Sequence, residues 1–239
     1  ADLPICADMA EFAEVVADWH DPELVRFAAG EEAHRDWLAW SDPQPRDGIT
    51  MDLGPCVAAM RDLLPPDTII CNGAGNFSGW WHRYWRYAAM PCQLAPTSGT
   101  MGYGLPAAVA AALRFRDRTV VCVAGDGDFL MNGQELATAA QYGVDLLVVL
   151  VDNGGYGTIR MHQEREYPER VSATALANPD FVRLAEAYGG WGERVAATAA
   201  FAPALARAMA RTGIRLLHCI TDMDVINTAT TIGAMRAKG

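Results

Sequence analysis

The chain has 239 residues, of which 51% are hydrophobic and 20% are charged, and its formal net charge is −10. This length suits one large domain, or one domain with an appendage, and the apolar content is ample for a core. The acidic balance argues against nucleic acid or an anionic membrane as a partner, and no apolar run reaches the length of a membrane span.

The start of the chain, ADLPICAD, has neither a basic segment nor a long apolar stretch, so it does not predict a signal peptide. None of the six cysteines forms a CxxC pair, and Cys71, Cys122 and Cys219 sit inside apolar runs. A thiol in such a run behaves as a small hydrophobe, and a disulfide framework is not expected at this size. We therefore expect buried, reduced thiols in a cytoplasmic protein.

Residues 1–45 differ in character from the rest of the chain. Their predicted elements are a short strand over Leu3–Cys6, a helix capped by Asp8, and a charged helix over Glu23–Trp40. The following run, SDPQPRDG, has the composition of a linker. We expect residues 1–45 to be an appendage to a domain formed by residues 46–239.

From residue 46 onward, helical periodicity alternates with apolar runs that are typical of buried parallel strands. Helices are predicted over Asp52–Leu64, Leu105–Phe115, Asn132–Tyr142 and Ala202–Arg211, with another starting at Pro179 after an Asn178 cap. Strands are predicted over Thr68–Cys71, Thr119–Ala124, Leu146–Val151, Trp191–Val195 and Leu216–Ile220. The alternation predicts an α/β fold, with an open, mostly parallel, doubly wound sheet of five or six strands and helices on both faces. The tail from Asp222 has weak periodicity, and we expect it to wander or to dock on another chain.

One segment, Phe77–Tyr87, holds six aromatic residues in eleven. The favoured interpretation is a helix packed against a neighbouring subunit or domain, because such a patch is costly to expose. The alternative is a wall of an active-site entrance.

Two neighbouring strands end in polar, glycine-rich turns. Gly125-Asp126-Gly127 follows the first strand, and Asp152-Asn153-Gly154-Gly155 follows the second. Ligands bind at the carboxyl ends of strands in open α/β sheets. A carboxylate, an amide oxygen and a carbonyl such as that of Gly155 suit Mg²⁺, which prefers six oxygens and often shares them with a phosphate. In the alternative interpretation, Asp126 and Asn153 only cap helices.

The GDG turn, with Asn153 placed 27 residues after Asp126, resembles the diphosphate-binding signature of thiamine diphosphate enzymes. The stretch GDGDFLMNGQELATA is similar to the acetolactate synthase branch of that family. The resemblance implies a thiamine diphosphate-binding fold that uses Mg²⁺, with Asp126, Asn153 and the Gly155 carbonyl as metal ligands. The cofactor contacts that it implies in these two turns come from Gly125, Asp126, Gly127, Asp128, Asn153, Gly155, Tyr156 and Gly157.

Further contacts follow from the same resemblance. Asn76 falls where the family has a glutamine near the diphosphate, although Phe77 replaces a polar residue beside it. The stretch TSGTMGYG resembles the loop that cradles the aminopyrimidine ring. There the Gly99 carbonyl would accept a hydrogen bond from the 4′-amino group, and Met101 would wedge between the two cofactor rings.

The polar segment Tyr156–Arg170 corresponds by resemblance to a mobile helix or loop over the active site. Acetolactate synthases carry a tryptophan nine residues after the metal-binding Asn, and this chain has His162 there. His162 is either a catalytic acid or base that faces the substrate, or a solvated helix residue. We expect the charged residues Arg160, Glu164 and Arg165 to lie on the surface.

The resemblance implies a transferase or lyase that acts on 2-keto acids, as a carboligase or a decarboxylase. The partner it implies is a pyrimidine-binding domain, upstream or on another subunit of a homodimer or tetramer, and residues 1–45 would be the tail of an upstream middle domain. The isolated chain would then be inactive. Two alternatives stay open: a non-catalytic interaction module of the same fold, and a nicotinamide-dependent dehydrogenase built on Gly73–Gly79.

Overall fold

The computed structural model describes residues 2–19, 27–88 and 90–237, which divide into two compact units, Ala1–Trp40 and Ser41–Gly239. In the first unit, α1 (Met9–Ala17) begins after Asp8, whose side chain accepts from the Ala10 N–H, and α2 spans Phe27–Trp40. The strand predicted over Leu3–Cys6 is wrong, since these residues are irregular and exposed, and no strand of the described residues pairs with them. Part of the helix predicted over Glu23–Trp40 lies outside the described residues.

The second unit is built on a six-stranded sheet in the order β2-β1-β3-β4-β6-β5, and all its pairings are parallel. The strands are β1 (Ile69–Asn72), β2 (Gln93–Leu94), β3 (Val120–Gly125), β4 (Leu146–Asp152), β5 (Trp191–Val195) and β6 (Ile214–Ile220). The predicted open parallel sheet is confirmed. Its apolar runs arise because the central strands are buried on both faces.

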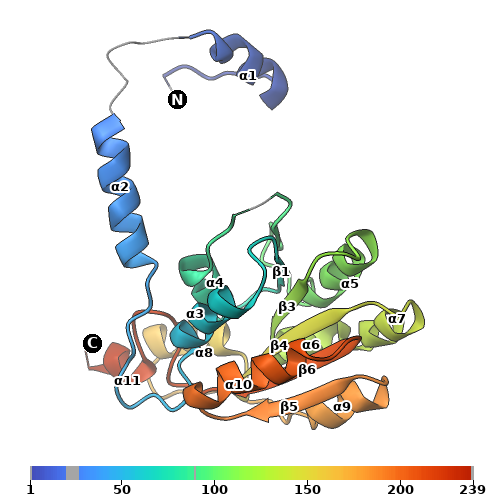
Figure 1. Cartoon of the computed structure of the whole chain (residues 1–239). Helices are drawn as coiled ribbons and strands as arrows, with labels where there is room; N and C mark the ends of the chain where they lie inside the picture. The colour runs from blue at the N-terminus through green and yellow to red at the C-terminus, as the bar shows by residue number, and fades with distance from the viewer. Residues whose placement is uncertain (1, 20–26, 89, 238–239) are drawn as a thin grey trace. The chain divides into compact units, whose positions relative to one another are not determined.

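Helices cover both faces of the sheet (Figure 1). One face packs against α3 (Leu53–Leu63), α4 (Ser78–Tyr84) and α10 (Thr198–Met209). The other face packs against α5 (Gly104–Arg114), α6 (Asp126–Asn132), α7 (Leu136–Gln141) and α9 (Phe181–Ala187). Alternation within a strand divides the two cores: Val121 and Val123 of β3 face the first set, and Cys122 faces the second. Within the described ranges, no helix combines the length and apolarity needed to cross a bilayer.

The helix after β3 starts earlier than the sequence predicts. It begins at Asp126, not at Asn132, and a short 3₁₀ turn (Gly133–Glu135) separates α6 from α7. Two acidic residues in the first turn of α6, Asp126 and Asp128, suit the positive end of a helix dipole. The turn that we expected to be a loop is therefore the start of a helix.

The aromatic segment forms the predicted helix, α4, but its packing partner is in the same unit. Trp81 is fully buried and Trp80 is 3% exposed, in the core that they share with α3. The expectation that these rings pack against a neighbouring subunit or domain is therefore wrong for α4.

The start of α9 also differs from the prediction. Asp180, not Asn178, is the N-cap, and its side chain accepts from the N–H groups of Val182 and Arg183. A carboxylate one residue before the first helical turn is an equally good cap. Asn178 is thereby free for a different role.

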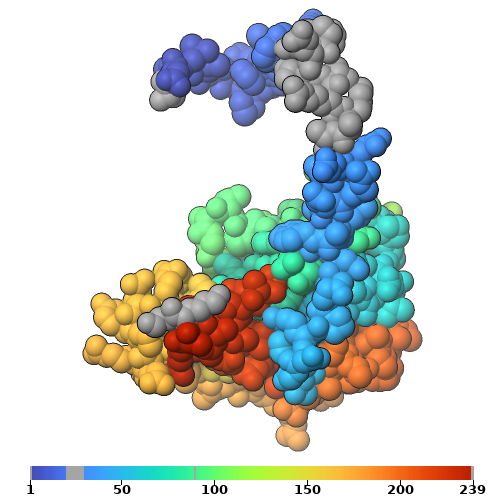
Figure 2. Space-filling view, turned by 90° about the vertical axis from the view of Figure 1, so that its left-hand side faces the viewer, coloured from blue at the N-terminus to red at the C-terminus, as the bar shows by residue number. Residues whose placement is uncertain are grey.

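The C-terminal segment docks on its own chain, contrary to our expectation for the tail. Helix α11 (Ile232–Arg236) packs beside α8 (Gly157–Glu166), where Figure 2 shows the red C-terminal segment against the yellow one. Arg236 Nη2 lies 2.8 Å from Glu164 Oε1, and Arg160 Nε donates to the same oxygen. Glu164 is 3% exposed, so the prediction that it is a surface charge is wrong.

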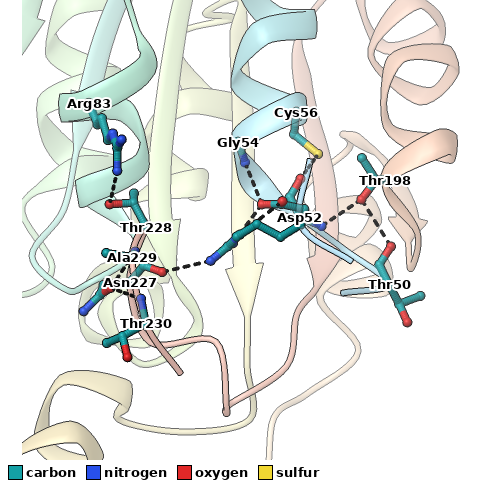
Figure 3. Close-up of polar contacts among 11 residues, drawn as sticks. Thr50, Asp52, Gly54, Cys56, Arg83, Thr198, Asn227, Thr228, Ala229 and Thr230 are labelled. Carbon is teal, nitrogen blue, oxygen red and sulfur yellow. Dashed lines mark hydrogen bonds and ion pairs between the residues drawn. The ribbon is translucent and has the colours of Figure 1, made fainter. Parts of the chain in front are cut away.

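A polar cluster ties the start of the second unit to its end. Asp52 caps α3 by accepting from the Gly54 N–H, and its own N–H donates to Thr198 Oγ1 at 2.7 Å (Figure 3). The Arg46 guanidinium binds both oxygens of Asp52 and donates to the Asn227 carbonyl. Arg46 and Asp52 are thus joined to Thr198 and Asn227, far along the chain, in one hydrogen-bond network.

Candidate functional site

A cavity of ≈ 480 Å³, including its open mouth, lies where β1, β3 and β4 end. The helices that follow β1 and β3 cover opposite faces of the sheet. The cavity therefore sits at the topological switch point between these two strands, where ligands bind in open α/β sheets. Of the twelve site residues that we predicted from the sequence, ten line it: Asn76, Met101, Gly125, Asp126, Gly127, Asp128, Asn153, Gly155, Tyr156 and Gly157. Gly99 and His162 do not.

Asp126 stands at the carboxyl end of β3 and is 3% exposed. Its Oδ1 accepts from the Gly127 N–H at 2.9 Å, and its Oδ2 accepts from Asn178 Nδ2 at 2.8 Å. The pKa of Asp126 is raised to about 6, mainly by burial and to a smaller extent by the nearby Asp152, while the hydrogen bonds from Asn178 and the Gly127 N–H oppose the rise. A cation bound beside this buried carboxylate would stabilise its charged form.

Asn153 and Gly155 form a tight turn directly after β4. Asn153 Oδ1 accepts from the Gly155 N–H at 3.2 Å, and the Gly155 carbonyl accepts from the Gly157 N–H at 2.9 Å. A Cβ at Gly155 would lie 2.3 Å from the Thr174 carbonyl oxygen, so only glycine lets the two segments approach. Asn153 and Gly155, which carry an amide and a carbonyl oxygen, line the same cavity as Asp126.

The side chain of Asp128 holds two loops together. Its Oδ1 accepts from the N–H of Ala74, after β1, and from the N–H of Gly102, before α5. Burial raises the pKa of this carboxyl. Asp128 thus fixes two loops that border the cavity.

The loop after β1 is joined to α8 through Asn76. The Asn76 N–H donates to Thr158 Oγ1 at 3.1 Å, and that hydroxyl donates to Asn76 Oδ1 at 3.0 Å. Beside it, the Phe77 ring lies over Gly125, where a Cβ would be 2.9 Å from the ring. Phe77 is the aromatic of its segment that lines this cavity, which supports the active-site-wall interpretation for this residue alone.

The two remaining candidates lie apart from the cavity. Gly99 is exposed, with a φ of +66°, in the loop that leads to Met101. His162 is exposed on α8, and its Nδ1 lies 2.9 Å from Arg165 Nη2. That position favours the interpretation of His162 as a solvated helix residue.

Sequence reasoning missed a buried polar network behind Asp126. The Nδ2 of Asn178 donates to Asp126 Oδ2 and to Asp152 Oδ1, both at 2.8 Å. Asp152 Oδ2 lies 2.7 Å from His218 Nε2, and the rings of His218 and Phe181 form a T-shaped contact. A histidine within the apolar run of β6 was a signal in the sequence; the position of Asn178 gave none.

The network keeps Asp152 ionised. Burial raises the pKa of Asp152, but hydrogen bonds from His218 and from the Gly154 N–H outweigh it, so this pKa lies below its usual value. An ionised carboxylate only accepts hydrogen bonds, so His218 Nε2 donates. Asp126 and Asp152 are therefore neighbouring carboxylates with opposite pKa shifts.

The oxygen atoms of the residues that line the cavity suit a hard cation as metal ligands. In the described part of the chain, no three His, Cys, Asp or Glu side chains gather as a metal cluster. The cavity instead combines Asp126 with neutral oxygens from Asn153 and Gly155. Mg²⁺ is commonly bound by one or two carboxylates, with water and substrate phosphates completing the octahedron. The residues present therefore fit a magnesium–diphosphate group.

This fold and this site define a class of protein. Residues 73–219 match the family described as "Thiamine pyrophosphate enzyme, C-terminal TPP binding domain", which is more than half of the chain. The chain belongs to this family and carries its cofactor-binding domain. The match includes Gly73–Gly79 and so removes the reason for a nicotinamide site there.

The relatives specify the branch. The chain is 36% identical over 191 residues to the acetolactate synthase isozyme 2 large subunit of Escherichia coli (strain K12), covering 79% of this chain and 34% of that protein. It is 42% identical over 139 residues to the acetolactate synthase large subunit of Parasynechococcus marenigrum (strain WH8102), covering 57% of this chain and 22% of that protein. The chain thus spans about a third or less of the length of these relatives.

A solved structure agrees with the fold. The thiamine diphosphate-dependent 4-hydroxybenzoylformate decarboxylase of Rhodococcus jostii RHA1 is similar, with a TM-score of 0.70 and 30% identity. The likeness covers 76% of this chain and 35% of that one. The expected acetolactate synthase-like C-terminal domain is confirmed.

Proposed function

We propose that this chain holds the diphosphate of thiamine diphosphate through Mg²⁺ in a larger enzyme that acts on 2-keto acids. One observation carries the proposal: Asp126 and Asn153, from the ends of neighbouring strands, line one cavity in a chain of this family. The bound cofactor supplies an electron sink for bond breaking and bond formation at a carbonyl carbon.

The metal ligands that we propose are a carboxylate oxygen of Asp126, Oδ1 of Asn153 and the carbonyl of Gly155. The diphosphate would lie against the backbone of residues 125–128, where the first turn of α6 turns N–H groups toward the cavity. Asn76, Tyr156 and Gly157 border the same space. Met101 lies at its edge, as a contact of the cofactor rings would, and the Gly99 carbonyl is the proposed acceptor for the pyrimidine amine.

The reaction that we propose is carboligation or decarboxylation of a 2-keto acid. The names of the relatives support the first, and the name of the similar solved structure supports the second. We further propose that a pyrimidine-binding domain, upstream or on a second subunit, completes the site in a homodimer or tetramer. Residues 1–45 would then be the tail of a middle domain. Five of the six free thiols of the described residues are buried, and Cys6 is exposed; the absence of a disulfide among them supports a cytoplasmic location.

A second candidate is a non-catalytic module of the same fold. Two observations favour it: an apolar ring, Phe77, borders the diphosphate side of the cavity, and the residue at position 162 is an exposed histidine. This alternative retains cofactor binding but not turnover, which makes the two candidates separable.

The test is a titration of the complete gene product that carries this chain with thiamine diphosphate, with and without Mg²⁺, followed by tryptophan fluorescence. Saturable binding that requires Mg²⁺, together with turnover of a 2-keto acid such as pyruvate, is the expected result. Binding without turnover of any 2-keto acid would favour the non-catalytic module. Absence of binding under both conditions would end the proposal.

A further inference from the structure

We propose that Asn178 is a positioning residue of the metal site, which holds the carboxylate of Asp126 in the orientation that Mg²⁺ binding needs. The inference rests on the proposed function, because it concerns the cation at the same cavity. Asn178 itself does not line that cavity and acts only through Asp126.

The geometry of Asn178 leaves little freedom to its amide. An asparagine amide nitrogen has two N–H donors, and each reaches one carboxylate oxygen, of Asp126 and of Asp152, at 2.8 Å. The flipped amide would turn its oxygen toward two acceptors, so the carboxylates fix which atom faces them. Asn178 therefore donates to both members of a pair of carboxylates that also contact each other directly.

The segment that carries Asn178 is tied to the proposed metal-binding turn. The Leu176 N–H donates to the Gly154 carbonyl at 2.9 Å, and the Tyr156 N–H donates to the Thr174 carbonyl at 2.9 Å. Gly155 and Ala175 form an antiparallel bridge between these bonds. The short ladder brings Asn178 to Asp126 from a segment that no helix or strand fixes in place.

Asp152, the second carboxylate bound by Asn178, is also held by several hydrogen bonds. Asp152 Oδ1 also accepts from the Gly154 N–H at 2.9 Å, and Asp152 Oδ2 bonds to His218 on β6. Asp152 is therefore a fixed support, and the Asn178 amide transmits its position to Asp126. Second-layer partners of this kind orient metal ligands, and their loss typically costs about 10–100-fold in metal affinity.

One atom of the network is unsatisfied among the described residues. Asn178 Oδ1 is buried and has no hydrogen-bond donor. Buried acceptors in native proteins are nearly always paired with protein or ordered water. The amide is therefore held through its nitrogen alone, on the two carboxylates.

The test compares Asn178→Ala and Asn178→Ser with the unchanged complete gene product. The Mg²⁺ concentration for half-maximal thiamine diphosphate binding should rise about 10–100-fold in the alanine variant. The serine variant keeps one donor and should give a smaller rise. At saturating Mg²⁺, the cofactor affinity of both variants should be within about threefold of that of the unchanged protein, because Asn178 affects cofactor binding only through Asp126 and the cation. If the alanine variant fails to fold, the serine variant answers the same question.

The matched control is Asp180→Ala, two residues further along the same segment. It removes the cap of α9 but leaves the carboxylate pair intact, so its Mg²⁺ requirement should stay within about twofold of the unchanged protein. An unchanged requirement in Asn178→Ala, or equal rises in Asn178→Ala and Asp180→Ala, would overturn the inference. Failure of the unchanged protein to bind the cofactor would overturn the proposed function first, and the inference with it.

Discussion

Asp126 is the residue on which the proposed metal site depends. It is a buried carboxylate at a strand end, and its hydrogen bonds go to one backbone N–H and one amide. We predict that Asp126→Ala abolishes Mg²⁺-dependent cofactor binding without unfolding the protein, because the side chain belongs to neither apolar core of the sheet. Calorimetric titration with thiamine diphosphate and Mg²⁺, with a melting curve beside it, checks both parts. Binding at unchanged affinity would remove Asp126 from the metal ligands.

The raised pKa of Asp126 also predicts how the metal-free protein responds to pH. The pKa is about 6 in the fold, against about 3.9 in the unfolded chain, so the folded state binds more protons between these values. Stability from this group is therefore present below pH 4 and is lost as pH rises through 6. Two pKa units correspond to about 3 kcal/mol as an upper limit.

Asp126→Asn removes this titration while keeping the shape of the side chain. Without metal, we expect the variant to gain stability relative to the unchanged protein as pH rises from 4 to 7, by up to about 3 kcal/mol. Urea unfolding at several pH values with a chelator present measures the difference. A difference that is flat with pH would show that Asp126 titrates near its ordinary value.

At the scale of elements, α8 is held between the cavity and the C-terminal helix. Its first turn lines the cavity through Gly157, Thr158 and Ile159, and Glu164 near its other end binds Arg236 of α11. Hydrogen bonds from Arg236, the Glu169 N–H and Arg160 lower the pKa of Glu164 to about 2. The charged contact therefore persists throughout the physiological pH range.

We predict that Glu164→Gln releases α11 from α8. A glutamine side chain carries no charge, so it cannot form the paired, charge-assisted hydrogen bonds with Arg236, and Arg236 and Arg160 lose their counter-charge. Amide hydrogen exchange should speed up in α8 and α11, with little change in β3 and β4. Glu166→Gln is the control, since Glu166 pairs with Arg165 on the exposed side of the same helix. Equal amide hydrogen exchange rates in the two variants would contradict the prediction that Glu164 holds α11 against α8.

The sheet could be predicted from the sequence, because burial on both faces leaves long apolar runs without alternation. Strand β5 was predicted with its observed bounds, and β3 and β4 within one residue at either end. The start of α6 was missed because a glycine between two acidic residues resembles a loop, whereas here it forms the first turn of a helix. Local composition does not distinguish these cases.

The site was predictable where one motif carries it and unpredictable where distant segments meet. The turns at Asp126 and Asn153 follow strands, and the sheet itself brings strand ends together. Asn178 and His218 reach the same place from a loop and from a strand far along the chain. Their contacts depend on tertiary structure. Asn178, directly before Pro179, has the local features of a helix cap and was therefore assigned as one.

At the scale of the whole molecule, this chain spans about a third or less of the length of its relatives. The cavity lies at the surface of the second unit, and on α6 beside it Leu130 and Met131 are 43% and 47% exposed. Apolar side chains exposed next to a ligand cavity favour a covering partner. The proposed pyrimidine-binding domain would supply that cover and exclude water from the reacting carbon.

We therefore predict that the purified 239-residue chain turns over no 2-keto acid, while the complete gene product does. The reason is physical: a chain that binds one end of the cofactor can hold its diphosphate but cannot orient or activate its reactive ring. Carbon dioxide release and ligated product from pyruvate, measured with saturating thiamine diphosphate and Mg²⁺, compare the two proteins. Cofactor binding by the short chain is measured alongside, since weak, Mg²⁺-dependent binding without turnover is the expected pattern. Robust decarboxylation or carboligation by the 239-residue chain would mean that these residues build the whole catalytic site, and the proposed need for a second domain would be wrong.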